Sequence, residues 1–386
     1  MLKDLFSLDP QIVFLNHGSF GACPRPVFEE YQAWQIKLEQ QPVHFLGTEL
    51  DNYLYHSREV LGEYIHASAN DIVYIPNATH GVNIVARSLN LKPGDEILTT
   101  DHEYGACNFT WDFIRRKTGA ACIYQTIRLP VTSQEEIVEQ LWRGVSLHTK
   151  VIFFSHITSP TSHTFPVQWI CKRAREAGII TVIDGAHAPG QLTLDLYSLQ
   201  VDFYVGNCHK WMLSPKGAGF LYARPDVQNL IEPLIVSWGY QSNFTSPRES
   251  SFIDLLQWSG TKDPAAALSV PAAIGFMREN HWEQVRASCH QLLYSAIERI
   301  CDQTGLPPLY PLESDFYLQM GTIPIPKVRD LNELKSRLYN DYKIEIPCIE
   351  WNTRHFIRLS VQGYNSNDDI DILVNALSKL IPNLIE

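Results

Sequence analysis

Residues 179–187 read IITVIDGAH, and residues 201–210 read VDFYVGNCHK. Each stretch opens with an apolar, β-branched or aromatic run of strand length and closes on polar residues, so we expect two buried strands with polar side chains after them. These polar residues are Asp184, His187, Asn207, His209 and Lys210. In open parallel sheets, ligands bind outside the carboxyl ends of the strands, and the two stretches are therefore predicted to face one site.

The chain around these stretches alternates strand-like and helix-like segments from about residue 70 to residue 222, which predicts a sheet covered on both faces. The predicted strands span residues 72–75, 96–99, 121–126, 151–155, 179–184, 203–206 and 219–222. The predicted helices span residues 79–89, 104–117, 133–145 and 167–177. The predicted fold class is α/β, with a mostly parallel seven-stranded sheet.

The pattern changes after residue 222 and predicts a smaller α+β domain. Helical spacing covers residues 264–277 and 282–300, strand-like runs cover 316–320, 344–347 and 355–360, and an amphipathic helix covers 368–380. The first twenty residues are predicted to form an arm. We therefore assign residues 21–262 to a large domain, and residues 1–20 and 263–386 to a small domain with its arm.

The composition of the 386-residue chain excludes several classes of function. A hydrophobic fraction of 45% and a charged fraction of 19% are typical of a globular protein of two or three domains. The net charge of −11 opposes binding to nucleic acid or to an acidic membrane surface. The eight cysteines lie singly, without metal-site spacing, which predicts reduced thiols and no metal. With no export or membrane-spanning run recognised, we predict a cytoplasmic protein.

Asp184 and Lys210 together suggest a specific chemistry. Taken alone, Asp184 and His187 are more typical of a turn beside a surface histidine, or of a fragment of a metal site, and most lysines are solvated. Lys210, however, follows an apolar strand and precedes Trp211, Met212 and Leu213. An amine and a carboxylate at neighbouring strand ends suit pyridoxal 5′-phosphate (PLP), whose chemistry needs a Schiff-base lysine and a partner for the pyridine nitrogen. Burial would lower the pKa of such a lysine and leave it reactive.

Further motifs make the chain resemble the class V aminotransferases, the fold-type I PLP enzymes that include cysteine desulfurases. The motifs are Asp184 to His187, His209-Lys210, NATHG at residues 77–81, Gly260-Thr261 and Arg358-Leu359-Ser360. FLNHGSFG at residues 14–21 and IEIP at residues 344–347 are most similar to the isopenicillin N epimerase-like branch. The motifs extend from about residue 14 to residue 370, which is nearly the whole chain.

The resemblance implies a cofactor role for each matching residue. Lys210 matches the Schiff-base lysine, Asp184 the partner of the pyridine nitrogen, and His187 a residue that hydrogen-bonds the phenolic oxygen. The implied phosphate ligands are Ala78 through its backbone N–H, Thr79, Asn207 where relatives often have serine, His209, and Thr261 from a second subunit. Thr79 begins a predicted helix, and helix N-termini bind anions. The shared phosphate site implies a homodimer.

The remaining implied contacts concern the cofactor ring and an amino acid substrate. Tyr104 matches an aromatic residue that stacks on the ring, although a core aromatic at a helix start has the same pattern, and Ser159 matches a contact to the phenolic oxygen. Arg358 matches the arginine that binds the substrate carboxylate, a task that a planar guanidinium suits. Asn16 and His17 are expected to line the substrate entrance.

The sequence predicts loss of the substrate α-proton to Lys210 and leaves the next step open. Epimerisation, transamination and β-elimination all follow from that step. An isopenicillin N epimerase-like reaction is our first hypothesis, and a carbon–sulfur β-lyase of the cysteine desulfurase or desulfhydrase type is the alternative. Cys348 lies in an apolar, strand-like setting, which favours a structural thiol over one that carries a persulfide. A PLP protein without turnover does not need Lys210, and no GxGxxG or Walker motif supports a nucleotide enzyme.

Overall fold

The structure is a computed structural model that describes residues 2–240 and 250–385. Its largest sheet has seven strands in the order β2-β8-β7-β6-β5-β3-β4, and in this described part of the chain β8 alone runs antiparallel to its neighbours. The strands are β2 (Ile72–Ile75), β3 (Glu96–Thr100), β4 (Ala121–Gln125), β5 (Thr149–Ser155), β6 (Ile180–Gly185), β7 (Phe203–Asn207) and β8 (Gly219–Ala223). The predicted α/β class and mostly parallel sheet are confirmed.

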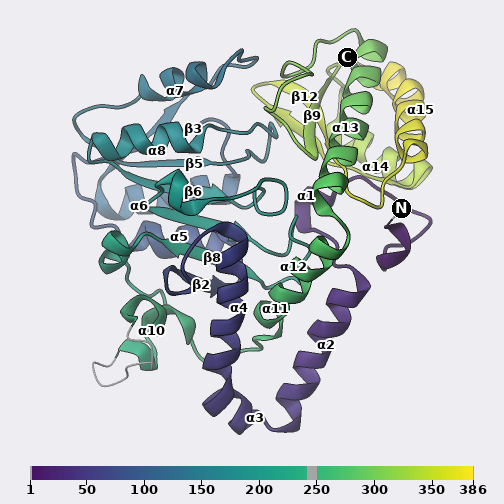
Figure 1. Ribbon diagram of the computed structural model, residues 1–386. Helices are drawn as coiled ribbons and strands as arrows, with labels where there is room; N and C mark the ends of the chain where they lie inside the picture. Colours follow the sequence, from purple (N-terminus) through teal and green to yellow (C-terminus); the bar gives the residue numbers. More distant parts are fainter. Residues whose placement is uncertain (1, 241–249, 386) are drawn as a thin grey trace.

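Helices cover both faces of this sheet because its central strands are apolar on both faces. Phe153 of β5 packs against Trp111 with ring centroids 5.4 Å apart, whereas the next residue, Phe154, packs against Phe165 on the opposite face. The covering helices are α5 (Ala78–Ser88), α6 (Gly105–Thr118), α7 (Gln134–Trp142), α8 (Val167–Glu176) and α10 (Ser251–Gln257). Figure 1 shows α7 and α8 on one side of the sheet and α5 and α6 on the other.

The smaller α+β domain contains a three-stranded antiparallel sheet in the order β11-β12-β9. Its strands are β9 (Met320–Ile325), β11 (Cys348–Trp351) and β12 (Arg354–Ser360), and its helices are α13 (Trp282–Thr304), α14 (Leu331–Tyr342) and α15 (Asn367–Leu384). The N-terminal arm joins this domain, since β1 (Val13–Phe14) pairs in parallel with β10 (Ile344–Glu345). The exact boundaries of the two domains stay a prediction.

Two long helices, α2 (Arg25–Gln40) and α4 (Leu50–Ile65), form a projecting pair that we did not predict (Figure 1). Val27 is the buried residue of α2, so the helix has little apolar periodicity to detect. The remaining elements are short and are η1 (Lys3–Leu5), α1 (His17–Phe20), α3 (Pro42–His44), η2 (Phe45–Glu49), η3 (Ala69–Asp71), α9 (Leu196–Leu199), η4 (Pro225–Leu230), η5 (Trp238–Tyr240), α11 (Ala265–Leu268) and α12 (Val270–Glu279). No helix in the described residues has the length and apolarity needed to cross a membrane.

Three predicted elements of the small domain differ from the structure. The strand predicted at 316–320 begins only at Met320, because the aromatic residues before it pack in a loop. The strand predicted at 344–347 ends at Glu345, and the chain re-enters a sheet at Cys348 as β11, a strand we did not predict. The helix predicted at 264–277 is two helices, because Pro271 stands in the first turn of α12, where its missing N–H is tolerated.

Candidate active site

A cavity of about 460 Å³ opens at the carboxyl ends of β5, β6 and β7. The predicted residues that line it are Ala78, Thr79, Tyr104, Ser159, Asp184, His187, Asn207, His209 and Lys210. Ser19, Phe20 and Ser155, to which we had assigned no role, also line it. The structure therefore gathers most of the predicted cofactor residues around one space, at the sheet edge where the strand pattern placed them.

The N-terminal arm crosses directly over the backbone beside Lys210. Gly21 has a φ of 71°, and a Cβ there would lie 2.1 Å from the carbonyl oxygen of His209, so this close approach requires glycine. His17 is fully buried, and its Nε2 lies 3.0 Å from the carbonyl oxygen of Lys210. Burial lowers the pKa of His17 to about 3. We expected His17 at the substrate entrance, but it lies outside the cavity lining and supports the backbone of Lys210.

Lys210 is placed beside a histidine and near two charged groups. Its Nζ lies 3.3 Å from Nε2 of His187, whose Nδ1 accepts a hydrogen bond from Trp211 Nε1 at 3.3 Å. Burial lowers the pKa of Lys210 to about 8; Arg358 also lowers it, whereas Asp184 opposes the shift. The amine therefore loses its proton far more readily than a solvated lysine does, as a nucleophile or general base requires.

Asp184 is a buried carboxylate at the end of β6. Its Oδ1 accepts from the backbone N–H of Ala186 at 2.9 Å, and its Oδ2 accepts only a weak hydrogen bond from the Cys107 thiol at 3.4 Å. Burial raises the pKa of Asp184, and the nearby Lys210 opposes that rise. A buried carboxylate with so little compensation is stabilised by a cationic or N–H-bearing ligand group.

The N-terminus of α5 forms the anion-binding end of the cavity. Asn77 caps the helix by accepting from the backbone N–H of His80, and Asn207 Oδ1 accepts from the N–H of Ala78 at 2.8 Å. We expected the N–H of Ala78 to bind phosphate, but Asn207 already satisfies it. In the described residues the backbone N–H of Thr79, in the same first turn, has no hydrogen-bond partner, and helix N-termini bind anions through such N–H groups.

His209 lies at the same end of the cavity. Its Nδ1 lies 3.0 Å from the carbonyl oxygen of Ala218, so Nδ1 carries a proton and donates it. Burial lowers the pKa of His209 to about 4, which leaves Nε2 as an unprotonated acceptor in the absence of an anion. Nε2 therefore binds an unprotonated phosphate oxygen only after the ring takes up a proton.

Arg358 is a buried cation without a counter-charge in the described residues. Its Nη1 donates to both the carbonyl and the hydroxyl oxygen of Ser159 at 2.9 Å, and its Nη2 donates to Ser19 Oγ at 3.1 Å, while Nε has no partner. Burial lowers the pKa of Arg358 to about 10, and the Tyr104 phenol opposes that shift. A buried guanidinium held by neutral groups is suited to binding an anionic ligand group such as a carboxylate.

Ser159 and Asn16 act on Arg358 in ways the sequence did not predict. Ser159 was expected to contact a phenolic oxygen, and in the structure it accepts hydrogen bonds from Arg358. Asn16 is almost completely buried and lies outside the cavity lining; it accepts from Ser19 Oγ at 2.6 Å and donates to Glu345 at 2.9 Å. Asn16 therefore orients Ser19, which in turn holds Arg358.

Thr261 does not lie in this cavity. It is exposed and lines a separate apolar groove of about 540 Å³ between the α3–η2 segment and α10. Val43 and Trp238, which also line this groove, are 86% and 62% exposed. The predicted contact from a second subunit stays a prediction for this single chain.

Comparisons with known proteins identify the family of the chain. The family model for aminotransferase class-V matches residues 21–373. An isopenicillin N epimerase from Amycolatopsis lactamdurans is 33% identical over 390 residues, with 98% of this chain and 97% of that protein covered. The chain belongs to the class-V aminotransferase family.

Two further proteins are similar to the chain, one in sequence and one in fold. A putative L-cysteine desulfhydrase from Oryza sativa subsp. japonica is 26% identical and covers 95% of this chain and 83% of its own length. A solved structure of a C-DES variant, with glycine covalently linked to its PLP cofactor, has the same fold at a TM-score of 0.83 and 20% identity, covering 98% of this chain and 99% of that one. The class-V chain described here is a PLP-dependent enzyme.

The residues that line the cavity have the chemical groups and the positions needed to hold PLP. The cavity offers a readily deprotonated amine at Lys210, a buried carboxylate at Asp184 and a helix N-terminus at Thr79. These groups match the aldehyde, the ring nitrogen and the phosphate of the cofactor. Among the described residues no cluster of three or more His, Cys, Asp or Glu side chains could hold a metal ion.

Two residues beneath the cavity were missed by the sequence analysis. Cys107 donates to Asp184 from inside α6, and Glu103 lies buried between Thr100 and Ser155. Glu103 stands in the polar stretch TDHE at residues 100–103, where an acidic residue is ordinary, so the sequence offered no signal of its burial. Cys107 gave no signal either, because a thiol within a helix is typical of a core residue.

Proposed function

We propose that this class-V enzyme epimerises an amino acid, in the manner suggested by its isopenicillin N epimerase relatives. The observation that carries the proposal is the proximity of two buried groups: Lys210, an amine with a pKa of about 8, and Arg358, a guanidinium for which the described residues supply no counter-charge. Arg358 is suited to the substrate carboxylate, and Lys210 then faces the α-carbon. When bound, PLP withdraws into its ring the electron pair left at that carbon.

Inversion needs one group to remove the α-proton and another to return a proton to the opposite side of the same carbon. We assign the first task to the Lys210 amine and the second to the phenol of Tyr104. Tyr104 lines the same cavity, and its influence on the pKa of Arg358 supports a position near the substrate carboxylate. Isopenicillin N itself is not part of the proposal.

The second candidate function is carbon–sulfur β-elimination, because desulfhydrase relatives also align over most of the chain. It would use the same proton removal by Lys210. A persulfide route receives no support from the thiols, since none of the cavity-lining residues in the described chain is a cysteine. Cys348 lies in β11 outside that lining, and burial raises its pKa to about 12.

Incubation of the holoenzyme in heavy water with a panel of amino acids tests the proposal. We expect α-deuterium uptake and inversion with the side chain retained for at least one substrate, and loss of both with Lys210→Ala. Pyruvate and sulfide from cysteine or cystine, without inversion of any amino acid, would overturn epimerisation in favour of the lyase.

We also propose that the enzyme is a homodimer whose second copy covers the groove at Thr261. The exposed Val43 and Trp238 favour an apolar partner surface, and Thr261 is the residue expected to reach the partner's phosphate. Sedimentation should give twice the 44.0 kDa chain mass, and Val43→Lys should shift it toward the monomer. A monomer with full cofactor occupancy would contradict this arrangement.

We propose a cytoplasmic location because the cysteines are not joined in disulfides. All eight are free thiols, and five of them, Cys107, Cys171, Cys208, Cys289 and Cys301, are buried. Free thiols persist in reducing compartments. Fractionation of the native host's cells should place the protein with cytoplasmic markers.

A further inference from the structure

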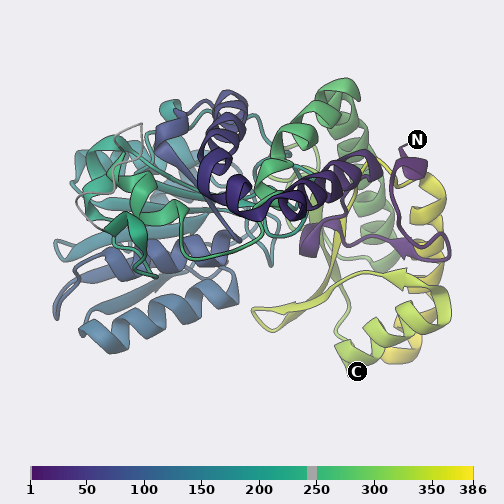
Figure 2. The ribbon, with the colours of Figure 1, turned by 90° about the horizontal axis from the view of Figure 1, so that it is seen from below.

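The tip of the β11–β12 hairpin extends from the small domain to the carboxyl end of β3 in the seven-stranded sheet. Trp351 and Arg354 form its last strand pair, and Asn352 and Thr353 make the turn with φ values of 48° and 61°. In Figure 2 the yellow-green hairpin projects away from the helices of its own domain. Its tip meets residues 101–104, which connect β3 to α6 and are called the β3–α6 turn below.

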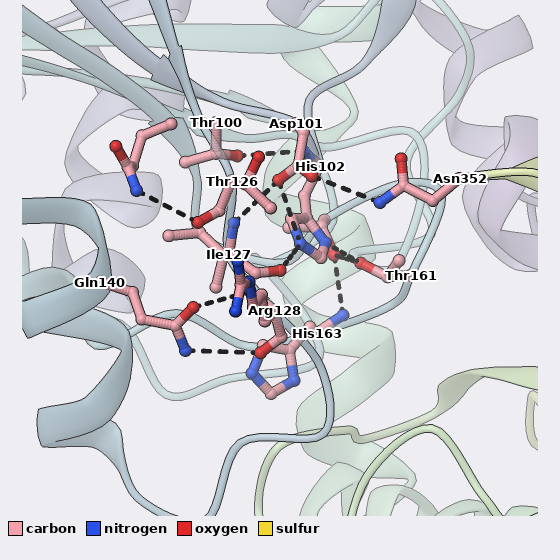
Figure 3. Close-up of polar contacts among 12 residues, drawn as sticks. Thr100, Asp101, His102, Thr126, Ile127, Arg128, Gln140, Thr161, His163 and Asn352 are labelled. Carbon is pink, nitrogen blue, oxygen red and sulfur yellow. Dashed lines mark hydrogen bonds and ion pairs between the residues drawn. The ribbon is translucent and has the colours of Figure 1, made fainter. Parts of the chain in front are cut away.

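Three contacts join the hairpin tip to the β3–α6 turn. Trp351 Nε1 donates to the carbonyl oxygen of Asp101 at 2.9 Å. Asn352 Nδ2 donates to Asp101 Oδ2 at 3.3 Å (Figure 3). The Trp351 ring packs against the His102 ring with centroids 4.5 Å apart. The contact therefore combines directional hydrogen bonds with ring packing.

The β3–α6 turn is otherwise held by the large domain alone. Asp101 Oδ1 accepts from the N–H of Ile127 at 3.0 Å, and His102 Nε2 lies 2.7 Å from the carbonyl oxygen of Ile127, to which it must donate. His102 Nδ1 is then the acceptor for the Thr161 hydroxyl at 2.7 Å. Figure 3 shows His102 between these partners. Every polar atom of the buried imidazole is satisfied, so the turn has one well-defined position.

This turn and this hairpin each carry a residue that we assign to the substrate site. Tyr104 follows His102 by two positions and lines the cavity. Arg358 lies on β12, the second strand of the hairpin, and donates to Ser159, which is two residues before Thr161. The hairpin thus links the guanidinium of Arg358 to the β3–α6 turn, which positions the phenol of Tyr104.

We propose that Trp351 and Asn352 are positioning residues that hold the β3–α6 turn, and thereby couple occupation of Arg358 by a carboxylate to the placement of Tyr104. The three contacts act as an interdomain clamp, because a shift of the hairpin with its domain strains or releases the hydrogen bonds that hold the turn. The coupling rests on the proposed function in one respect, namely that Arg358 binds the substrate carboxylate. The clamp itself does not depend on which reaction follows.

Hydrogen exchange of the holoenzyme, read by mass spectrometry on peptides that cover residues 101–107, tests the clamp without any turnover. The amide of Asp101 donates to the carbonyl oxygen of Gln125 and that of His102 donates to Thr100 Oγ1, so both report opening of the turn. Trp351→Phe removes the indole donor, and Asn352→Gly removes the amide while suiting the positive φ. Thr353→Gly is the matched control, at an exposed residue of the same turn.

We expect exchange at residues 101–107 to be about threefold to tenfold faster in Trp351→Phe and in Asn352→Gly, because each loses one hydrogen bond, and to be unchanged in Thr353→Gly. Wild-type exchange rates in both variants, or equal acceleration in the control, would overturn the clamp. Asn352→Gly alters only an exposed side chain, so its folding is not at risk.

Propionate, a carboxylate without an amine, tests the coupling. It should slow exchange of the 101–107 peptides in the wild type and in Thr353→Gly, but not in the double variant Trp351→Phe/Asn352→Gly. Equal slowing in the double variant would show that Arg358 communicates with the turn by another route and would overturn the coupling. Failure of the proposed epimerase reaction would appear instead in the amino acid panel and would leave these exchange rates unaffected.

Discussion

The imidazole of His187 presents its N–H to the amine of Lys210, with Nε2 and Nζ 3.3 Å apart. The direction follows from Trp211, whose indole nitrogen can only donate and therefore requires a lone pair on His187 Nδ1. Burial keeps the pKa of His187 well below its usual value, so the neutral ring has its proton on Nε2. A neutral Lys210 accepts that proton in a hydrogen bond, whereas an ammonium cannot, and the pair therefore favours the reactive form of the lysine.

The pH dependence of covalent cofactor attachment should report this lowered pKa. We expect the rate at which the apoprotein bonds PLP to rise about tenfold per pH unit below pH 8 and to level off above it, since only the neutral amine attacks. Absorbance after rapid mixing with PLP measures this rate. A profile that keeps rising to the ordinary lysine pKa of 10.5 would contradict the lowered value.

Removal of the Arg358 charge should move that profile. Arg358 lowers the pKa of Lys210, so Arg358→Met should shift the midpoint above pH 8 and should also raise KM for the amino acid substrate at least tenfold. Arg354→Met, at an exposed residue on the same strand β12, is the control and should change neither quantity. Equal shifts in the two variants would mean that the effect is not specific to the buried guanidinium.

Glu103 should make the stability of the apoprotein depend on pH. Thr100 and Ser155 donate to its two carboxylate oxygens, yet burial raises its pKa from 4.5 to about 8. The folded state then holds one more proton than the unfolded state between these pH values. The stability that this proton provides is complete below about pH 4.5 and is lost as the pH rises through 8, by up to about 1.4 kcal/mol per pH unit.

Glu103→Gln replaces the protonated acid with a group of the same shape that does not ionise. The difference in unfolding free energy between the variant and the wild type should therefore grow in favour of the variant from about pH 5 to pH 8. Urea denaturation of the two apoproteins at several pH values in this window measures the difference. A constant difference would show that Glu103 is ionised throughout.

Local sequence patterns predicted the elements whose structure depends mainly on their own residues. The apolar runs before Asp184 and Lys210 each become a buried parallel strand, and the register of β6 and β7 brings the two strand ends to one edge. The same logic gave the start of α5, where Asn77 supplies a capping side chain directly before the helix.

The features that were missed depend on contacts between segments far apart in the chain. Asn207 satisfies the N–H of Ala78 across 129 positions, and Trp351 reaches Asp101 across 250. His17 belongs to a motif that suggested the entrance, but whether it faces substrate or the backbone of Lys210 depends on the path of the arm over His209. Periodicity describes the face of one element and does not identify its partner, so these roles needed the three-dimensional structure.

Replacement of Cys348 should leave the reaction intact. Its thiol lies in β11 outside the cavity lining, and burial raises its pKa to about 12, so the thiolate that a sulfur-transfer route needs is scarce. We expect Cys348→Ala to retain kcat within about twofold of the wild type for epimerisation, and also for any sulfide release. A loss of sulfide release with unchanged inversion would instead assign this cysteine to a separate persulfide activity.

Tyr104→Phe should separate proton removal from inversion. The variant keeps the aromatic ring beside the cavity and removes the only group of Tyr104 that can donate a proton. With Lys210 intact, we expect the α-proton of the substrate still to exchange with deuterium in heavy water, but with retained configuration, because Lys210 returns the proton to the side from which it took it. Inversion should fall about 100-fold or more, the usual contribution of a general acid.

Nuclear magnetic resonance measures the exchange, and chiral chromatography measures the inversion, on the same samples. Tyr124→Phe is the matched control: Tyr104 and Tyr124 are each 48% exposed, but Tyr124 lies on the edge strand β4, outside the cavity lining. It should change neither rate. If Tyr104→Phe inverts its substrate as fast as the wild type, the second proton comes from another group, and the two-sided arrangement of Lys210 and Tyr104 is wrong. If exchange and inversion fall together, the phenol acts by positioning the substrate, since a missing proton donor would spare the step that Lys210 performs alone.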